Sequence, residues 1–337
     1  MKVLVTGADG LLGANIVREL LSRGCSVRAV IQPGSKSRTL DNLPVEKVQF
    51  DLLEDSDRLL DAISSCDVII HAAAITDQWA DADLTWKVNY DGTEKVLDDC
   101  VKAGSKKLVF IGSASSYQFG TLENPGDESA SFPGAYKGVA YMESKFKASE
   151  LVREYARKHG LWAVILCPTF MIGPYDSRPS SGELIRQFVI KKLKVTSPGG
   201  RNFVYVGDAA KAVVNAMEKG ESGSSYILGG ENVTYRDFFG KVAEVVGMPS
   251  PRIVLPGGVI LLVGFLGSLY GKLTGRRAMI NSQIARFSLL RTFYSPARAI
   301  KELNMPQTSI DKAIEEAIAC LKEYGHLDAG DEQTVKG

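Results

Sequence analysis

The sequence predicts an α/β protein with a doubly wound parallel sheet and a smaller mixed α/β region in its C-terminal half. Two observations support this. The first half alternates short apolar strand patterns with amphipathic helical patterns, and the chain opens on an apolar strand that runs directly into three glycines, each three residues apart. Alternating strands and helices form a parallel sheet with helices on both faces.

The first half contains six predicted strands and four predicted helices. Its strands are expected at 3–5, 27–31, 48–50, 68–70, 108–111 and 163–166, and its helices at 12–22, 56–64, 91–103 and 141–159. The second half is less regular, with helices at 183–192, 209–218, 235–246 and about 309–324, and short strands at 202–206 and 225–228. The apolar residues of each helix repeat at helical spacing, which predicts one buried face.

Composition excludes several classes of protein. The 337 residues are 45% hydrophobic and 23% charged, with a net charge of +1, so nothing indicates nucleic acid as a partner. The five cysteines are scattered and the histidines number three, so we expect neither a metal site nor a disulfide framework. Reduced thiols, and a first strand too close to Met1 for a signal peptide, indicate a cytoplasmic protein.

The most apolar stretch runs from Val259 to Tyr270 and contains Gly264 and Gly267. It is shorter than the roughly 20 residues that span a bilayer, so we expect no transmembrane segment. We expect a buried helix or the wall of an apolar pocket, and a monotopic membrane contact is the alternative.

The glycine turn predicts a dinucleotide site. Gly7 allows a tight turn after the first strand, Gly10 lets backbone N–H groups approach a phosphate, and Gly13 lets the following helix pack on the strand. A pyrophosphate binds at such a helix N-terminus. The predicted phosphate-binding residues are therefore Gly7, Ala8, Asp9, Gly10, Leu11, Leu12 and Gly13.

The end of the second strand bears on which dinucleotide binds. NAD-selective sites carry an Asp or Glu there, whereas this strand ends at Gln32 and is followed by Lys36 and Arg38. Cations within reach of a 2′-phosphate, with no carboxylate to repel it, predict NADP, and NAD is the alternative. After the third strand, Asp51 could accept the adenine amino group or could cap a helix.

Tyr141 and Lys145 are four residues apart and therefore share one helix face. A phenol has a pKa of about 10, and a neighbouring ammonium lowers it, which suits proton transfer near neutral pH. A serine cluster at 113–116 follows the fifth strand. We predict that Ser113 polarises a substrate carbonyl beside the phenol, with Ser115 as the alternative.

These features together resemble the extended short-chain dehydrogenase/reductase family. The resemblance covers the chain to about Leu303 and rests on Thr6–Gly13, Asp51-Leu52, His71–Ala74, Asn89–Thr93, Ser113, Tyr141–Lys145, Cys167–Thr169, Gly173-Pro174, Phe203–Asp208 and Ile227–Glu231. It implies a Rossmann domain and a smaller substrate domain. We expect the first at 1–167, completed by segments around 202–220, the second, interleaved, at 168–327, and a disordered tail at 328–337.

The resemblance also implies roles for single residues. Ser113, Tyr141 and Lys145 would carry catalysis, and Asn89 would support a water relay to Lys145. The additional cofactor contacts that it implies are Leu52, Ala72, Ala73, Ala74, Pro168 and Thr169. Family members often form homodimers through a four-helix bundle, to which helices 91–103 and 141–159 would contribute here.

Three functions are compatible with these residues. The first is reduction of a ketone or aldehyde on an apolar small molecule, as in dihydroflavonol reductases and 3β-hydroxysteroid dehydrogenases, with Tyr141 as general acid/base. The second is a nucleotide-sugar epimerase or dehydratase, and the third is a dinucleotide-binding scaffold without activity.

Different residues bear on the first two functions. An apolar cleft would favour the reductase. The residues that could line it are 259–270, Phe287, Leu289, Leu290, Phe293 and Tyr294. For the sugar enzyme, the candidate diphosphate ligands are Arg178, Arg186, Arg201 and Arg276.

Overall fold

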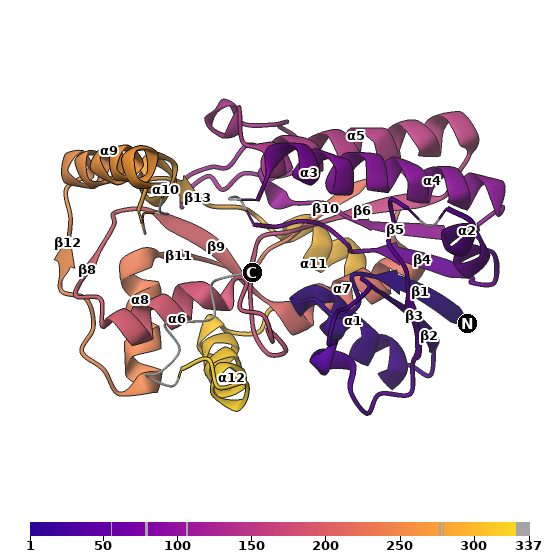
Figure 1. Ribbon diagram of the computed structural model, residues 1–337, viewed down its shortest axis with the longest axis horizontal. Coiled ribbons are helices and arrows are strands. Elements are labelled where there is room, and N and C mark those ends of the chain that lie inside the picture. Colours follow the sequence, from indigo (N-terminus) through magenta and orange to yellow (C-terminus); the bar gives the residue numbers. More distant parts are fainter. Residues whose placement is uncertain (55, 78–79, 106, 276–277, 279, 328–337) are drawn as a thin grey trace.

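A seven-stranded parallel sheet forms the larger part of the molecule (Figure 1). The computed structural model describes residues 1–54, 56–77, 80–105, 107–275, 278 and 280–327. The sheet has the order β10-β6-β5-β4-β1-β2-β3 and confirms the predicted doubly wound architecture. Its strands are β1 (Lys2–Thr6), β2 (Ser26–Ile31), β3 (Glu46–Gln49), β4 (Val68–His71), β5 (Lys107–Ile111), β6 (Ala163–Pro168) and β10 (Ser225–Leu228).

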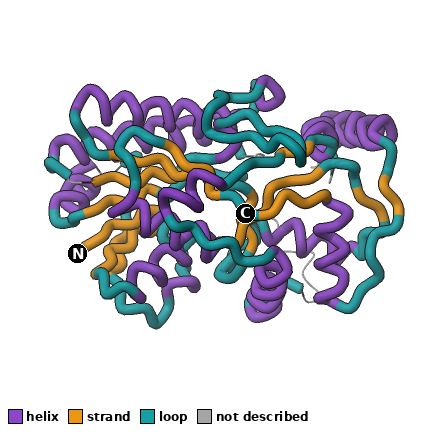
Figure 2. Tube along the Cα trace, turned by 180° about the vertical axis from the view of Figure 1, so that it is seen from behind, coloured by secondary structure: helices purple, strands orange, loops and turns teal. Residues whose placement is uncertain are grey.

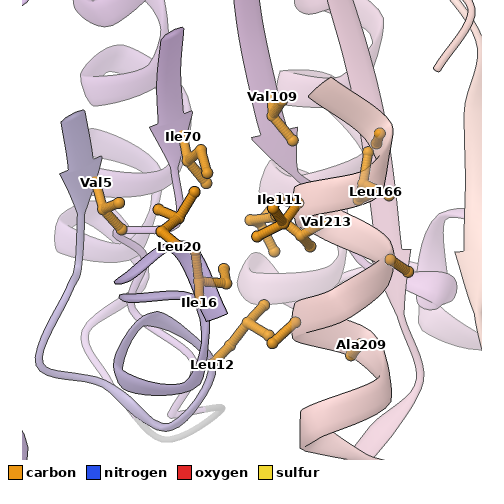
Figure 3. Packing of buried hydrophobic residues seen from close by; sticks show 14 of the residues in the cluster. Val5, Leu12, Ile16, Leu20, Ile70, Val109, Ile111, Leu166, Ala209 and Val213 are labelled. Carbon is orange, nitrogen blue, oxygen red and sulfur yellow. The ribbon is translucent and has the colours of Figure 1, made fainter. Parts of the chain in front are cut away.

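Helices cover both faces of this sheet. On one face lie α1 (Leu11–Ser22), α7 (Val206–Lys219) and α11 (Ala297–Leu303); on the other lie α2 (Ser56–Ser64), α4 (Gly92–Lys102) and α5 (Ala140–His159). Side chains alternate along a strand, so Val3 and Val5 pack toward α1 while Leu4 packs toward α2 and α4. Figure 3 shows the first of these cores, where Leu12, Ile16 and Leu20 of α1 lie against the strands and α7.

A short helix and a π-helical turn lead into α4. Helix α3 (Ala82–Trp86) is capped by the Asp81 side chain, and the turn Lys87–Asp91 follows it without a break. Helix α5 packs beside α4. It ends at Gly160, whose φ of +66° is the left-handed conformation common after the last turn of a helix.

The C-terminal half forms a second lobe around a four-stranded sheet (Figure 2). Strand β9 (Gly200–Tyr205) pairs with β11 (Glu231–Thr234) on one side, and with β7 (Phe170–Ile172) and β13 (Arg291–Thr292) on the other. An aromatic and aliphatic core joins this sheet to α6 (Gly182–Lys191), α8 (Tyr235–Val246) and α12 (Ile310–Glu323). A ribbon of β8 (Val195–Thr196) and β12 (Ile253–Val254) leads to α9 (Gly257–Thr274) and α10 (Ser282–Ser288).

Two sequence predictions need correction. We expected residues 202–220 to complete the large sheet, but β9 belongs to the small sheet, α7 only covers the large one, and the added strand is β10. We expected the apolar segment after residue 256 to be a buried helix or the wall of an apolar pocket, with a monotopic membrane contact as the alternative. It forms α9, which is exposed along most of its length and is long and apolar enough to cross a membrane. The division at residue 167 stays a prediction, and the expected disordered tail at 328–337 lies outside the described residues.

Gly7 fixes how closely β1 and β4 approach each other. Its φ is +62°, and a Cβ there would lie 2.8 Å from the backbone of Ala73. Gly24 has a similar φ of +73°, but a Cβ added to it would meet nothing within 4 Å, so it is a matched control. We expect Gly24→Ala to lower the free energy of unfolding by about 1 kcal/mol, the cost of the left-handed backbone alone.

Gly7→Ala carries the same backbone cost and a clash besides. We expect it to lower the free energy of unfolding by about 3 kcal/mol or more, because the backbone of Ala73 cannot move as a flexible side chain can. Urea unfolding of both variants without cofactor measures the difference. Equal losses in the two variants would show that Gly7 is not packed against the end of β4.

Candidate active site

The glycine turn lies at the C-terminal edge of the large sheet, between β1 and α1. A Cβ on Gly13 would lie 2.1 Å from the carbonyl oxygen of Gly7, so α1 can pack this closely only with glycine there. A Cβ on Gly10 would meet only that same oxygen, at 3.4 Å. The turn is therefore tightly packed toward the protein at Gly7 and Gly13 and open above Gly10.

The N-terminus of α1 fits a phosphate. The first N–H groups of a helix have no partner within it, and Gly10, the N-cap, has no side chain with which to bind them. The helix dipole adds a partial positive charge at the same place. An anionic pyrophosphate can accept these N–H groups, as the sequence predicted for Leu11, Leu12 and Gly13.

The loop after β2 is fastened onto the glycine turn. Asp9 accepts hydrogen bonds from Ser35 Oγ at 2.5 Å and from Arg178 at 2.8 Å, and its carbonyl accepts one from Thr39. This places residues 36–38 beside the turn. Gln32, Lys36 and Arg38 are exposed there. Of this contact network, sequence reasoning had named Asp9 as a cofactor contact and had missed Ser35 and Thr39.

Thr6 joins the ends of β1 and β4. Its hydroxyl accepts the backbone N–H groups of Ala72 and Ala73 at 3.2 and 3.1 Å, and it lies 2.8 Å from His71 Nδ1. With both acceptor positions used, the hydroxyl donates its proton to Nδ1. Complete burial lowers the pKa of His71 to about 3, so the ring is neutral. His71 is therefore a packed strand-end residue.

The same chain of hydrogen bonds continues to the π-helical turn. His71 Nε2 donates to the Thr93 hydroxyl at 3.2 Å, and that hydroxyl donates to the Asn89 carbonyl at 2.7 Å. The buried Asn89 side chain binds both backbone groups of Ile75 and donates to Ser144 Oγ at 3.2 Å. Asn89 thus holds the segment after β4 against α5. Its predicted role in a water relay to Lys145 stays a prediction.

Ser113 and Tyr141 come together from β5 and α5. Ser113 follows the end of β5, and its hydroxyl lies 2.8 Å from that of Ser115. Tyr141, in the first turn of α5, lies near Ser113, whose hydroxyl lowers the pKa of the phenol. The second candidate serine therefore supports the first, and the phenol faces the C-terminal edge of the sheet.

Lys145 lies one turn further along α5 and is 3% exposed. Its Nζ donates to the carbonyl oxygen of Ile111 at 2.5 Å and lies 4.7 Å from the centre of the Phe110 ring. Burial lowers the pKa of Lys145 to about 8. The ammonium therefore remains the main form at neutral pH while being poised to lose its proton just above it.

The expected effect of Lys145 on Tyr141 is not found in this structure. We expected the ammonium to lower the pKa of the phenol. Instead, desolvation raises the pKa of Tyr141, and the hydrogen bond with Ser113 only partly opposes this. The physical reason is that burial destabilises the charged phenolate, and the Lys145 ammonium donates its hydrogen bond to the Ile111 carbonyl instead of to the phenol oxygen. Tyr141 is therefore a protonated phenol near neutral pH.

The remaining predicted cofactor contacts lie at the ends of neighbouring strands. Asp51 accepts from the Leu53 N–H at 2.8 Å, which closes a turn five residues before α2 rather than capping that helix, and its predicted contact with the adenine stays a prediction. Pro168 ends β6, and Thr169 donates to Asn202 Oδ1 at 2.8 Å. Leu52 is half-buried beside Asp51. Because parallel strands end at one edge, these residues share an edge with the glycine turn.

An apolar cluster borders Tyr141. Buried Tyr136, Val139 and Met142 pack with Phe287 and Leu290, at and just beyond the end of α10, and Tyr141 contacts the same cluster. Two residues that were expected to line an apolar cleft therefore pack against the same cluster as Tyr141. Of the others, Phe293 and Tyr294 are almost fully buried, and Tyr294 donates to the Tyr117 carbonyl.

Two of the four candidate diphosphate arginines are paired with carboxylates. Arg178 pairs with Asp9, and Arg186 pairs with Glu183. Arg201 donates to the Tyr235 hydroxyl at 2.5 Å and lies over the Phe170 ring, with no carboxylate partner among the described residues. Arg276 lies outside the described residues.

Comparison with known proteins agrees with this geometry. The sequence profile of the NAD dependent epimerase/dehydratase family matches residues 3–229. The chain is 30% identical over 329 residues to a putative dihydroflavonol 4-reductase of Synechocystis, covering 96% of this chain and 95% of that protein. It is also 30% identical over 332 residues to sterol demethylase protein B of Methylococcus capsulatus, covering 97% and 100% of the two chains.

Solved structures show the same architecture. The crystal structure of gox2253 superposes with a TM-score of 0.84 at 28% identity, covering 97% of this chain and 99% of that one. A UDP-glucose 4-epimerase of Thermus thermophilus in complex with NAD superposes with a TM-score of 0.75 at 23% identity, covering 96% and 99%. The second likeness concerns the fold alone.

The fold and the site together define an NAD(P)-dependent oxidoreductase of the extended short-chain dehydrogenase/reductase type. The chain belongs to the NAD dependent epimerase/dehydratase family.

Burial of Lys145 has a consequence for stability that can be measured. Since its pKa falls from 10.5 to about 8 on folding, the unfolded chain binds more protons between these pH values, and the free energy of unfolding rises with pH. Lys145→Met removes this contribution. We expect the difference between wild type and variant to change by about 2 kcal/mol in favour of wild type from pH 8 to pH 10. Parallel pH profiles in denaturant unfolding would contradict the assigned burial.

Proposed function

We propose that this enzyme reduces a ketone or aldehyde on an apolar small molecule, using NADPH or NADH. The observation that carries the proposal is the position of Tyr141. Its phenol lies near the Ser113 hydroxyl, which follows the end of β5, and Tyr141 packs against an apolar cluster that Phe287 and Leu290 also contact. A proton donor beside an apolar wall suits a carbonyl on a hydrophobic substrate.

Each polar residue then has a defined task. A reduced nicotinamide, when bound, supplies the hydride. Ser113 holds the substrate oxygen by hydrogen bonding, and Tyr141 gives that oxygen its proton. The raised pKa of Tyr141 keeps the phenol protonated beforehand, which carbonyl reduction requires. Lys145, still mostly protonated at neutral pH, places a positive charge in the same buried region, where its ammonium donates to the Ile111 carbonyl and can also meet the ribose of a bound nicotinamide.

Loss of the phenol hydroxyl should separate catalysis from binding. We expect Tyr141→Phe to lower kcat by about 10²- to 10⁴-fold, because no other group donates this proton. NADPH binding, followed by fluorescence, should stay near the wild-type value. Tyr155→Phe is the control, since Tyr155 lies on the same helix and its hydroxyl binds Asp98 at the surface.

Unchanged turnover in Tyr141→Phe would refute the catalytic assignment and, with it, the proposed reductase mechanism. If the wild-type protein turned over neither carbonyls nor nucleotide sugars, the result would favour the third function, a dinucleotide-binding scaffold without activity.

We propose NADP as the preferred cofactor. Lys36 and Arg38 are exposed on a loop that Ser35 and Thr39 fasten to the glycine turn, and β2 ends without a carboxylate. A 2′-phosphate gains two cations in this position, whereas the 2′-hydroxyl of NAD gains none.

The double variant Lys36→Ala/Arg38→Ala tests this preference. We expect KM for NADPH to rise roughly tenfold and KM for NADH to change less than about twofold, since only the phosphate loses its partners. Lys47→Ala, at an exposed cation on the neighbouring strand, is the control. A wild-type KM for NADH well below that for NADPH would overturn the proposal.

Arg201 favours a second candidate, a nucleotide-sugar epimerase or dehydratase. It is a largely enclosed guanidinium on β9 with aromatic neighbours and no carboxylate partner among the described residues. A diphosphate could take that place.

Arg201→Gln distinguishes the two functions. For the reductase we expect kcat on apolar ketones to change less than about threefold, because no substrate anion needs the guanidinium. For the sugar enzyme, calorimetric binding of UDP-sugars would be detectable in the wild-type chain and lost in the variant. Tight UDP-sugar binding by the wild-type chain would favour the second candidate.

The homodimer through α4 and α5 remains a proposal. The two helices pack side by side on one face of the sheet. Among the described residues, Val101 is the sole exposed large apolar side chain on either helix. Such a dimer would therefore rest on polar contacts. The cytoplasmic location is likewise proposed only.

A further inference from the structure

Helix α9 lies at the end of the C-terminal lobe, away from the large sheet (Figure 1), and its exposed side chains form an apolar surface. Only 11% of the helix is buried, and its buried residues are Ile260 and Gly264. Half of the large apolar residues that are exposed in the described part of the chain belong to this one helix: Val259, Leu261, Leu262, Val263, Phe265, Leu266, Leu269, Tyr270 and Leu273.

The neighbouring ribbon extends this surface. Val195 of β8 and Ile253 and Val254 of β12 are also exposed, and β12 leads directly into α9. We call these twelve residues the α9 surface. Monomeric soluble proteins rarely leave so many large apolar side chains exposed in one place, so something covers this surface.

The charges of the surrounding segments point to an anionic partner. Residues 184–207 and 245–301 contain thirteen of the 40 Lys and Arg of the chain and none of its 39 Asp and Glu. The net charge of the whole chain is only +1, so the excess belongs to these segments of the sequence, although Arg186 and Arg298 pair with Glu183, Glu221 and Glu302 outside them. Lys192 and Lys194 beside β8 and Lys272 near the end of α9 are all exposed.

Helix α9 lies along the protein surface and is held there from one side. A Cβ on Gly264 would lie 2.4 Å from that of Ala285, and a Cβ on Gly267 would lie 2.0 Å from the Ile280 carbonyl oxygen. The chain that follows the helix therefore folds back along it. Ser268 also binds Ser282, at the start of α10, at 2.9 Å. Packed along its side in this way, the helix can present its long exposed face to a bilayer interface, parallel to the membrane plane.

We propose that the α9 surface is a monotopic membrane contact that binds anionic phospholipid, with α9 lying in the plane of the interface. The apolar side chains of α9 enter the region between headgroups and acyl chains. The exposed Lys192, Lys194 and Lys272, which we call the charged rim, bind the lipid phosphates. This inference does not depend on the proposed reaction.

The contact would lie close to the catalytic residues. Helix α10 packs against α9 on one side, and Phe287 and Leu290 at its end belong to the cluster that Tyr141 contacts. Helix α10 therefore connects the α9 surface with the cluster against which Tyr141 packs. An enzyme placed there meets apolar substrates at the concentration they have in the bilayer.

Vesicle flotation of the full chain tests the proposal. We expect binding to vesicles of equimolar phosphatidylcholine and phosphatidylglycerol, weaker binding to phosphatidylcholine alone, and weakening by salt. The triple variant Leu262→Ser/Phe265→Ser/Leu266→Ser should bind roughly tenfold less, since each side chain is exposed and the fold needs none of them. Leu84→Ser/Leu122→Ser, two exposed leucines elsewhere, is the control and should bind as wild type.

The charged rim is tested separately. Lys194→Glu/Lys272→Glu should lose most binding to the anionic vesicles, and Lys219→Glu/Lys322→Glu should not. Arg252 is left unchanged because it shares a shallow hollow with Asp237 and Glu244. Thermal melting followed by circular dichroism confirms that each variant is folded.

Three results would overturn the proposal. The first is a wild-type chain that stays out of the vesicle fraction. The second is binding that the triple variant retains in full. The third is a wild-type chain that forms a dimer without lipid in light scattering and does not bind vesicles, together with a triple variant that is monomeric. That result would make the α9 surface an interface with a second copy of the chain.

Discussion

The close contact between the first strand and the first helix is the constraint on which the site depends. The carbonyl of Gly7 lies where a side chain at position 13 would be, and the backbone of Ala73 lies where one at position 7 would be. Glycine at both positions lets β1, α1 and β4 meet within one turn. The N-terminus of α1 is thereby directed across the ends of the strands, at the point where the strand order reverses. A larger residue at either position would separate the phosphate-binding turn from the rest of the edge.

The polar residues at that edge of the sheet form a connected network of hydrogen bonds. Thr6, the neutral His71 and Thr93 link β1 to the π-helical turn, and Asn89 links that turn to α5, which carries Tyr141. Hydrogen bonds in such a buried chain are satisfied at every step, which favours one arrangement over others. Burial then sets the electrostatics. It raises the pKa of the phenol, which stays protonated, and lowers the pKa of the Lys145 ammonium toward neutrality.

Much of this could be predicted from the sequence, because local patterns determine it. The order of strands and helices, the turn at Gly7 to Gly13 and the shared face of Tyr141 and Lys145 follow from spacing alone. What failed depended on contacts between distant segments. Lys145 was expected to act on Tyr141, but the carbonyl of Ile111, thirty-four residues away, takes its hydrogen bond. The exposure of α9 differs from the expected buried helix and agrees only with the stated alternative, because the hydrophobicity of a segment does not show whether the rest of the fold covers it. The network through Thr6 and Thr93 was not predicted, although both residues lie in motifs that carry the family resemblance, because a motif does not show which side chains bond to one another.

A crystal structure of the chain with NADP tests the central claim most directly. The account predicts that the pyrophosphate lies against the N-terminus of α1 above Gly10, and that the nicotinamide ring lies beside the Tyr141 hydroxyl, within reach of a substrate bound to Ser113. If the ring instead lay far from Tyr141, or the phenol turned into the protein interior when the cofactor bound, the assignment of this edge of the sheet as the active site would be wrong.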